Sequence, residues 1–247
     1  MNDLSLLLQC GGVIPFAEAQ VNIYQPTIAE IGFIGEKAFY SGCGILTFSK
    51  DSLSLEDKQR LEHMSDFEVL MLLLTDKNHE AQRNKIQALM VLSLIFPDYS
   101  INFTPQSIIL KKEDEIHLID TDNFHKFKEI LSTMFCLKGR GEDNQNYNPA
   151  NEQARKIAEK LLQGRQKAAA AKGEEKGGGI LARLVSILAI GLKMDMNVIS
   201  NYTVFQLFDQ YDRFELYEAN EMQFRARLAG ARDLEEIDNW RKDFHSK

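Results

Sequence analysis

The chain has 247 residues, of which 44% are hydrophobic and 26% charged, enough for one large domain or two small ones with a buried core. Its formal net charge of −7 disfavours general binding to the phosphates of nucleic acid. The three cysteines, Cys10, Cys43 and Cys136, are odd in number and widely spaced. They therefore favour reduced thiols over a disulfide framework or a zinc site.

The sequence gives no sign of secretion or of a membrane span. No basic region precedes the apolar residues at the start of the chain, as a secretory signal would require. The longest apolar run, from Ile180 to Leu192, contains Arg183 and falls short of the roughly 20 residues that cross a membrane. We therefore expect an intracellular protein in which this run is a buried helix.

The first fifty residues are predicted to form strands and turns. The segment from Val21 to Tyr24 alternates apolar and polar residues. The segments Ala38 to Tyr40 and Gly44 to Phe48 contain residues that favour strands and are bracketed by glycines. Turn geometry explains those glycines, because their spacing matches no dinucleotide or P-loop fingerprint.

Helical signals follow. Ser54 can cap a short helix that runs to about Met64. Ser65 and Glu68 have the spacing of a capping box, with Ser65 at the N-cap, and open an apolar stretch. A further helix is predicted from Arg83 to Ile95 and is stopped by Pro97.

A β-hairpin is predicted next, followed by a helix. Ser107 to Leu110 and Ile116 to Ile119 are short apolar strands on either side of the charged turn from Lys111 to Glu115. Asp122 or Asn123 can cap a helix that runs to about Phe135.

The second half of the chain has a different composition. Asn148 and Pro149 start a helix that ends near Gln166, and the run up to Gly179 is rich in alanine, lysine and glycine without apolar periodicity. Helices are predicted from there to the end, where Leu234, Ile237 and Trp240 share the last one. The resulting fold class is an α+β N-terminal part followed by an all-α part. The predicted boundaries are an α+β domain at 1–147, a connecting helix at 148–166, a flexible linker at 167–179 and a helical domain at 180–247.

The densest polar cluster lies around the predicted hairpin and includes His117, Asp120, Asp122 and His125. Two carboxylates two residues apart at the end of a strand can hold Mg²⁺ in a nuclease. No lysine follows on an adjacent strand pattern, and a solvated turn with helix-capping acids explains these residues more simply. No histidine pair has metal-ligand spacing, and no base is signalled beside Cys43. We therefore expect no catalytic residue, no metal and no cofactor.

Two stretches are candidate binding surfaces. The basic residues from Arg155 to Lys167 could contact phosphates, although a solvated helix face explains them better. Aromatic residues recur at every third position of the helix predicted from Val204 to Asn220, where they form either core or a docking face for another helix. The protein-binding candidates are Phe205, Phe208, Tyr211 and Phe214.

In their order along the chain, several segments resemble the tail assembly chaperones of tailed bacteriophages and prophages of Gram-positive bacteria. The resemblance covers most of the chain and is one of arrangement. The segments that carry it are Ile31 to Glu36 with Phe39 and Tyr40, Ser65 to Glu68, Ile109 to Ile119, Asp122 to Leu131, Asn151 to Lys156, Ile180 to Ser186, Asn201 to Phe208, Leu228 to Gly230 and Ile237 to Trp240.

This resemblance implies a role that the spacing of residues does not show. Such chaperones coat the long helical tape measure protein in the host cytoplasm and keep it soluble until tail tube subunits polymerise around it. It implies a non-catalytic protein whose partner is the tape measure protein, with the tail tube protein as a second candidate partner, and leaves self-association open. The alternatives are a structural virion component of the neck or baseplate, a metal-dependent nuclease built on Asp120 and Asp122, and a nucleic-acid-binding regulator that uses Arg155 to Lys167.

Overall fold

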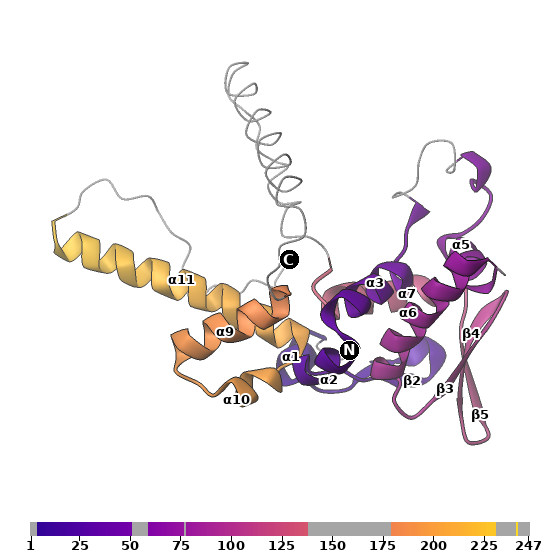
Figure 1. Ribbon diagram of the computed structural model, residues 1–247, viewed down its shortest axis with the longest axis horizontal. Helices are drawn as coiled ribbons and strands as arrows, with labels where there is room; N and C mark the ends of the chain where they lie inside the picture. Colours follow the sequence, from indigo (N-terminus) through magenta and orange to yellow (C-terminus); the bar gives the residue numbers. More distant parts are fainter. Residues whose placement is uncertain (1–3, 51–58, 77, 138–178, 231–240, 242–247) are drawn as a thin grey trace, which may run out of the picture. The chain divides into compact units, whose positions relative to one another are not determined.

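The computed structural model describes residues 4–50, 59–76, 78–137, 179–230 and 241. Contacts between Cα atoms divide the chain into two compact units, one made of residues 1–137 and 180–247 and the other of residues 138–179. All of the helices and strands described below belong to the first unit (Figure 1). An α+β N-terminal part precedes an all-helical C-terminal part, which confirms the fold class predicted from the sequence.

The N-terminal part mixes short strands with helices. Its elements are α1 (Leu4–Cys10), β1 (Ile14–Phe16), the 3-10 turn η1 (Ala17–Ala19), β2 (Val21–Ile23), α2 (Ile28–Ile34), α3 (Glu36–Leu46), α5 (Asp66–Thr75), α6 (His79–Ile95), β3 (Ser100–Thr104), β4 (Ser107–Lys112), β5 (Glu115–Ile119) and α7 (Phe124–Met134).

The C-terminal part consists of α9 (Ile180–Leu192), α10 (Met196–Ser200) and α11 (Val204–Leu228). The predicted helix from Ile180 is confirmed, but it is buried on one side only, because Ile180 and Ile190 are exposed. The predicted helix from Val204 is also confirmed and continues without a break to Leu228.

Both sheets are antiparallel. β1 pairs with β2 with Ile14 opposite Ile23, and β3, β4 and β5 form a three-stranded meander in that order. The meander contains the predicted hairpin, with Leu110 opposite His117, and adds β3, which the sequence analysis did not predict. Ile108, Leu110 and Ile119 are buried, so one face of the meander packs on the helices.

The strands predicted between Ala38 and Phe48 are wrong, because residues up to Leu46 belong to α3 and the two that follow form no strand. Its buried residues Phe39, Cys43 and Leu46 recur at the helical spacing of four and three, which places them on one side of the helix. Glycine at position 42 lets α3 approach α6 closely, since a Cβ there would lie 2.4 Å from the carbonyl oxygen of Gln87. Of the glycines that bracket the predicted strands, Gly42 therefore serves close helix packing.

The predicted capping box before α5 is confirmed. The Ser65 hydroxyl accepts a hydrogen bond from the Glu68 N–H (3.2 Å), and the Glu68 carboxylate accepts one from the Ser65 N–H (2.6 Å). Thr27 with Glu30 and Thr203 with Gln206 form boxes of the same kind before α2 and α11. Each of these boxes satisfies backbone donors that the first turn of a helix would otherwise leave without partners.

One hydrophobic core includes residues from both parts of the chain. Leu184, Leu188 and Leu207 belong to the same buried cluster as the phenylalanines of the N-terminal part, such as Phe39 and Phe127. The helical C-terminal part therefore packs directly on the α+β part. The boundaries at 147 and 180 stay predictions, because the connecting helix and nearly all of the linker lie outside the described residues.

Backbone and side-chain hydrogen bonds reinforce this packing. The Ile28 N–H donates to the Tyr202 carbonyl (2.9 Å), and Thr27 and Thr203 form an isolated antiparallel bridge. At the start of α9, the Leu181 N–H donates to both carboxylate oxygens of Glu36 at 3.2 Å. A carboxylate at a helix N-terminus is stabilised by the helix dipole as well as by the hydrogen bond.

Candidate protein-binding surface

The acidic residues after β5 form a turn that starts α7. The Asp120 carboxylate accepts hydrogen bonds from the backbone N–H groups of Asp122 (3.0 Å) and Asn123 (3.4 Å). The Asn123 side chain in turn accepts from the Asp120 N–H at 3.0 Å. Among the described residues, no group of three histidine, cysteine, aspartate or glutamate side chains is arranged to hold a metal ion.

The histidines near this turn make separate contacts. One ring nitrogen of His117 lies 3.1 Å from the Ala19 carbonyl oxygen, and its other nitrogen lies 3.5 Å from the Glu115 carboxylate. His125 lies 3.4 Å from Glu129, one helical turn further along α7. The structure thus holds the two histidines on different elements.

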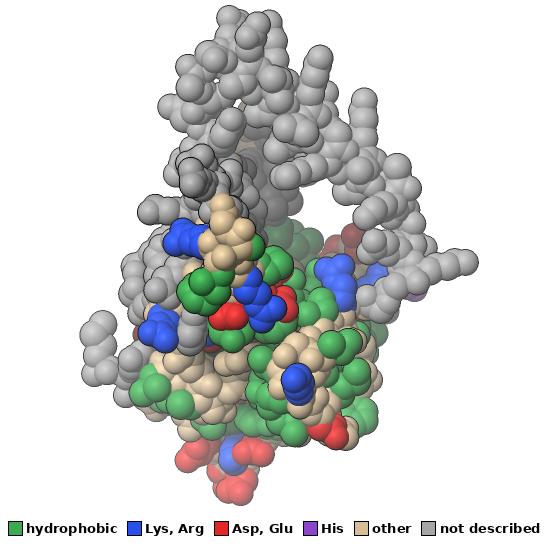
Figure 2. Space-filling view, turned by 90° about the vertical axis from the view of Figure 1, so that its left-hand side faces the viewer, with side chains coloured by type: hydrophobic (Ala, Val, Ile, Leu, Met, Phe, Trp, Pro, Cys, Tyr) green, Lys and Arg blue, Asp and Glu red, His purple; other side chains and the backbone are tan. Residues whose placement is uncertain are grey.

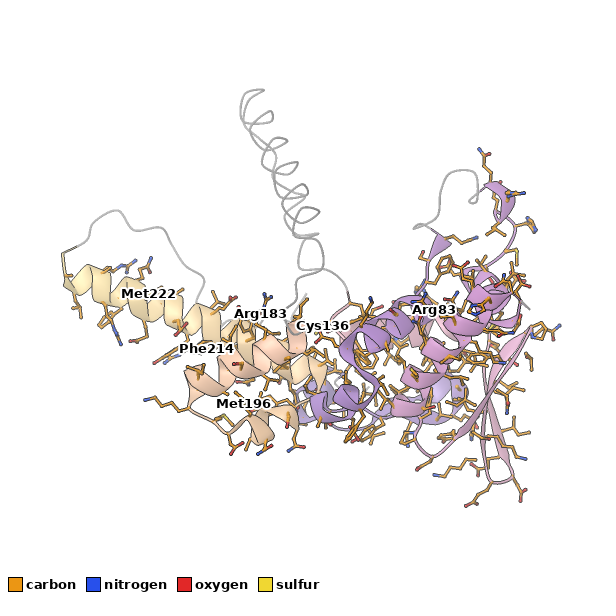
Figure 3. All side chains as sticks on the ribbon, viewed as in Figure 1. Arg83, Cys136, Arg183, Met196, Phe214 and Met222 are labelled. Carbon is orange, nitrogen blue, oxygen red and sulfur yellow. The ribbon has the colours of Figure 1, made fainter. Side chains whose placement is uncertain are left out.

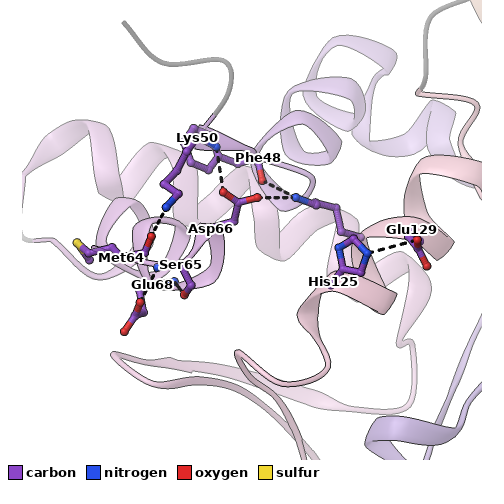
Figure 4. Close-up of polar contacts among 9 residues, drawn as sticks. Phe48, Lys50, Met64, Ser65, Asp66, Glu68, His125 and Glu129 are labelled. Atoms are coloured by element: carbon purple, nitrogen blue, oxygen red, sulfur yellow. Dashed lines mark hydrogen bonds and ion pairs between the residues drawn. The ribbon is translucent and has the colours of Figure 1, made fainter. Parts of the chain in front are cut away.

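A polar network joins the loop after α3 to α5 and α7 (Figure 4). The Asp66 carboxylate accepts hydrogen bonds from the Lys128 ammonium (2.7 Å) and from the Lys50 N–H (3.0 Å). Burial opposes ionisation of Asp66, but these hydrogen bonds and the two lysine charges outweigh it and hold the pKa of the carboxyl below its usual value. Each charge in this network has a structural partner, so the network ties elements together.

Cys43, the candidate nucleophile that was set aside on sequence grounds, is fully buried against the core. Burial raises the pKa of its thiol far above the usual value, which keeps the group protonated and unreactive.

The four aromatic candidates of α11 do not form one face. A helix turns by about 100° per residue, so each step of three residues falls about 60° short of a full turn. Three such steps place Phe205 and Phe214 on opposite sides of α11. Phe205 is buried, whereas Phe208, Tyr211 and Phe214 are half-buried and pack against the core.

Phe214 packs against α9 at a glycine. A Cβ at Gly191 would lie only 2.2 Å from the nearest atom of the Phe214 ring. The ring therefore occupies the space that a side chain on α9 would fill, between the two helices (Figure 3). Whether any of the four aromatic residues binds a partner stays a prediction.

Other apolar side chains of the C-terminal part are more exposed than these four. Figure 2 faces this side of the molecule and shows hydrophobic side chains gathered there among a few charged ones. The exposed apolar side chains of α9 to α11 are Ile180, Ile190, Met196, Val198, Tyr217, Met222, Phe224 and Leu228. Exposed apolar patches of this kind are typical of protein-interaction surfaces.

One set of these residues follows a heptad pattern along α11. From Phe214 the spacing is three, four, three and four residues, through Tyr217, Glu221 and Phe224 to Leu228. This is the a/d spacing of a coiled coil, which keeps side chains on one narrow stripe. We call Tyr217, Glu221, Phe224 and Leu228 the distal seam.

The distal seam lies where α11 extends past the end of α9 (Figure 1). Leu228 is 73% exposed and Phe224 is 59% exposed. The spacing of three residues that starts at Phe205 does not lead to this seam. The alternating three- and four-residue spacing after Phe214 was the signal that could have found it.

A polar hollow of about 300 Å³ lies beside the start of α11, lined by Gln9, Gln206, Asp209, Gln210 and Arg213. Its charged residues, Asp209 and Arg213, form an ion pair at 3.1 Å, and Gln206 donates to the Gln9 carbonyl (2.7 Å). These contacts join α1 to α11, so the hollow fits a structural junction.

Several sequence predictions lie outside the described residues. They are the connecting helix, nearly all of the linker, the basic stretch from Arg155 to Lys167 and the last helix with Leu234, Ile237 and Trp240. Among the helices that the structure describes, none combines the length and the apolar character that a membrane crossing requires.

Comparison with known proteins gives one match. A family model described as the YomV second domain matches residues 175–245, which include α9, α10 and α11. No curated protein and no solved structure matches the chain. YomV is a Bacillus phage or prophage protein, so residues 175–245 are similar to a domain of a phage-related protein.

Proposed function

We propose that this chain is a non-catalytic tail assembly chaperone that works in the host cytoplasm. It binds the tape measure protein and keeps it soluble while the phage tail is built. The observation that carries the proposal is the exposed apolar surface of α9 to α11, within the region that matches the phage-related domain. The resemblance of the chain's segments to such chaperones supplies the identity of the partner.

The chemistry of this surface suits a long amphipathic helix. A tape measure protein exposes an extended apolar stripe, which aggregates unless it is covered. Exposed residues on this surface include Met196 and Met222, whose flexible side chains adapt to different partner sequences. Several copies of a weakly binding chaperone on one long partner would gain affinity through avidity and could still be displaced by tube subunits.

Co-expression tests this function. The tape measure protein of the same phage is expected to be insoluble alone and soluble when this chain is co-expressed, and to be recovered with the tagged chain. Ile190→Asp places a charge in the proposed surface and should reduce recovery of the partner by roughly tenfold. Ile86→Asp changes a similarly exposed residue of α6 and serves as the matched control. The proposal would be contradicted if the yield of soluble tape measure protein were the same with and without this chain.

The runner-up is a structural component of the virion, in the neck or baseplate. Purified particles distinguish the two functions, because a chaperone leaves the tail and a structural component remains at fixed stoichiometry. Detection of this chain in particles at the level of other tail proteins would replace the proposed function with this alternative.

A further inference from the structure

We propose that two copies of this chain associate through antiparallel pairing of their distal seams. The pair has two-fold symmetry, so the same surface of α11 is used by both copies. This self-association goes beyond the proposed function, because it needs no tape measure protein.

The first reason is the continuity of the seam with an established helix contact. Upstream on the same heptad stripe, Leu207 is fully buried and Phe214 packs on Gly191 of α9. Beyond the end of α9 the stripe continues through Tyr217, Phe224 and Leu228, whose side chains are exposed. The seam thus has the pattern that packs against a helix, over a stretch that α9 does not reach.

The second reason is the position of Glu221, which selects the direction of pairing. In a parallel pair the two Glu221 side chains would face each other within the seam, where like charges repel. In an antiparallel pair, a positions face d positions, so Glu221 lies opposite Phe224 of the other copy. Tyr217 then lies opposite Leu228, and each apolar residue meets a partner or the stem of Glu221.

The third reason is charge complementarity along one flank. Glu218 and Arg225 both follow a d position of the heptad, so they lie on the same side of the seam. Antiparallel pairing places Glu218 of each copy beside Arg225 of the other, and the symmetry makes this contact twice. Within one chain Arg225 lies 3.7 Å from Glu221, a long contact that Glu218 of the other copy could replace or extend.

The size of the seam sets the expected affinity. The twelve residues from Tyr217 to Leu228 span roughly 17 Å of helix. An interface of this length falls below the standard size of a stable complex, so we expect a dissociation constant roughly in the micromolar to millimolar range. Such weak pairing would matter when many copies gather on one long partner.

Sedimentation velocity of the full chain tests the pairing without any partner. The average mass should rise from that of a monomer toward that of a dimer as concentration increases from about 10 µM to about 1 mM. Phe224→Glu should weaken association by roughly tenfold or more. Met222→Glu is the matched control, because Met222 is 68% exposed but lies outside the seam, and it should leave association unchanged.

A charge exchange tests the direction of pairing. Glu218→Arg and Arg225→Glu should each weaken association, and the double variant should restore it. The proposal is overturned if the wild-type chain stays monomeric at every concentration. It is also overturned if the Phe224→Glu and Met222→Glu variants lose association to the same extent. If the double variant does not regain association, the antiparallel arrangement is overturned. Binding of the tape measure protein is measured separately, so either proposal can fail alone.

Discussion

Two glycines of α3 lie two residues apart in the same helix but have different surroundings. A Cβ at Gly42 would lie 2.4 Å from the Gln87 carbonyl oxygen and 2.6 Å from Val91, whereas a Cβ at Gly44 would have no neighbour within 4 Å. The backbone atoms of α6 cannot move aside as a flexible side chain can. Position 42 therefore requires glycine for close helix packing, and position 44 does not.

Alanine substitutions at these positions should change stability in opposite directions. Gly42→Ala is expected to lower the free energy of unfolding by about 1–3 kcal/mol, because the added methyl group forces α3 and α6 apart. Gly44→Ala should raise it by up to about 1 kcal/mol, since alanine favours the helix more than glycine does. Urea denaturation followed by circular dichroism measures both. If the Gly42→Ala variant were as stable as the wild type, the contact between α3 and α6 would not require glycine at this position.

Asp66 gives the protein a defined dependence on pH. Burial disfavours its charge, but hydrogen bonds from Lys128 and Lys50 lower its pKa below the usual 3.8. A carboxyl with a lowered pKa in the folded state stabilises the fold above its unfolded pKa, and this stability is lost as the pH falls through the folded pKa.

The Asp66→Asn variant should therefore be less stable than the wild type by about 1 kcal/mol at pH 7, through loss of the charged partner of Lys128. The difference should shrink as the pH falls below 3.8 and through the lower folded-state pKa of Asp66, because the wild-type carboxyl then also becomes neutral. Asp98→Asn is a suitable control, because Asp98 and Lys112 form a more exposed ion pair at 3.0 Å. Thermal unfolding across this pH range measures both variants. The stabilising role of Asp66 would be contradicted if the two variants lost the same stability at every pH.

At the scale of elements, local signals in the sequence predicted some helices well and α3 poorly. Ser65 and Glu68 predicted the start of α5, because a capping box depends on residues three apart. In α3, the strand-favouring residues and glycines masked the helical spacing of Phe39, Cys43 and Leu46. Glycine is needed at position 42 because α6 packs against it, and α6 lies some forty residues away in the sequence.

The arrangement of the aromatic residues of α11 could not be predicted from their spacing. Phe205, Phe208, Tyr211 and Phe214 recur every third residue, so they wrap around α11 and pack against the core, and their role in binding stays a prediction. Exposure of Phe224 and Leu228 depends on where α9 ends relative to α11. The spacing of three and four residues after Phe214 could indicate the seam itself, but its exposure depends on this tertiary relation.

The capping box at the start of α11 leads to a test at the same scale. Thr203→Ala removes the hydroxyl that accepts from the Gln206 N–H (3.3 Å) and should lower the free energy of unfolding by about 1 kcal/mol. Thr203→Ser keeps the hydroxyl and should restore most of that loss. Equal stabilities of the alanine and serine variants, measured by urea denaturation, would exclude a stabilising role for this cap.

At the scale of the whole molecule, the shared core couples the N-terminal and C-terminal parts. Leu188 of α9 is fully buried and belongs to the same hydrophobic cluster as residues of β4 and α7. We therefore expect the described regions to unfold in one transition, as compact units with a continuous core usually do.

Leu188→Ala tests this coupling. The substitution should lower the free energy of unfolding by about 2–5 kcal/mol. Hydrogen exchange should show the same decrease in protection for the most protected amides of β4 and of α9, because both sets of amides exchange only when the whole unit unfolds. Loss confined to α9, α10 and α11 would show that the helical part unfolds independently.

The bridge between Thr27 and Thr203 has a consequence for synthesis of the protein. These residues are about 176 positions apart in the sequence, and they are the N-cap residues of α2 and α11. At a translation rate of roughly 5–20 residues per second, about 10–35 s pass between the synthesis of one residue and the other. During this interval the surface of α2 that will meet α10 stays uncovered on the ribosome. The native fold of this unit can therefore be completed only after the start of α11 has emerged.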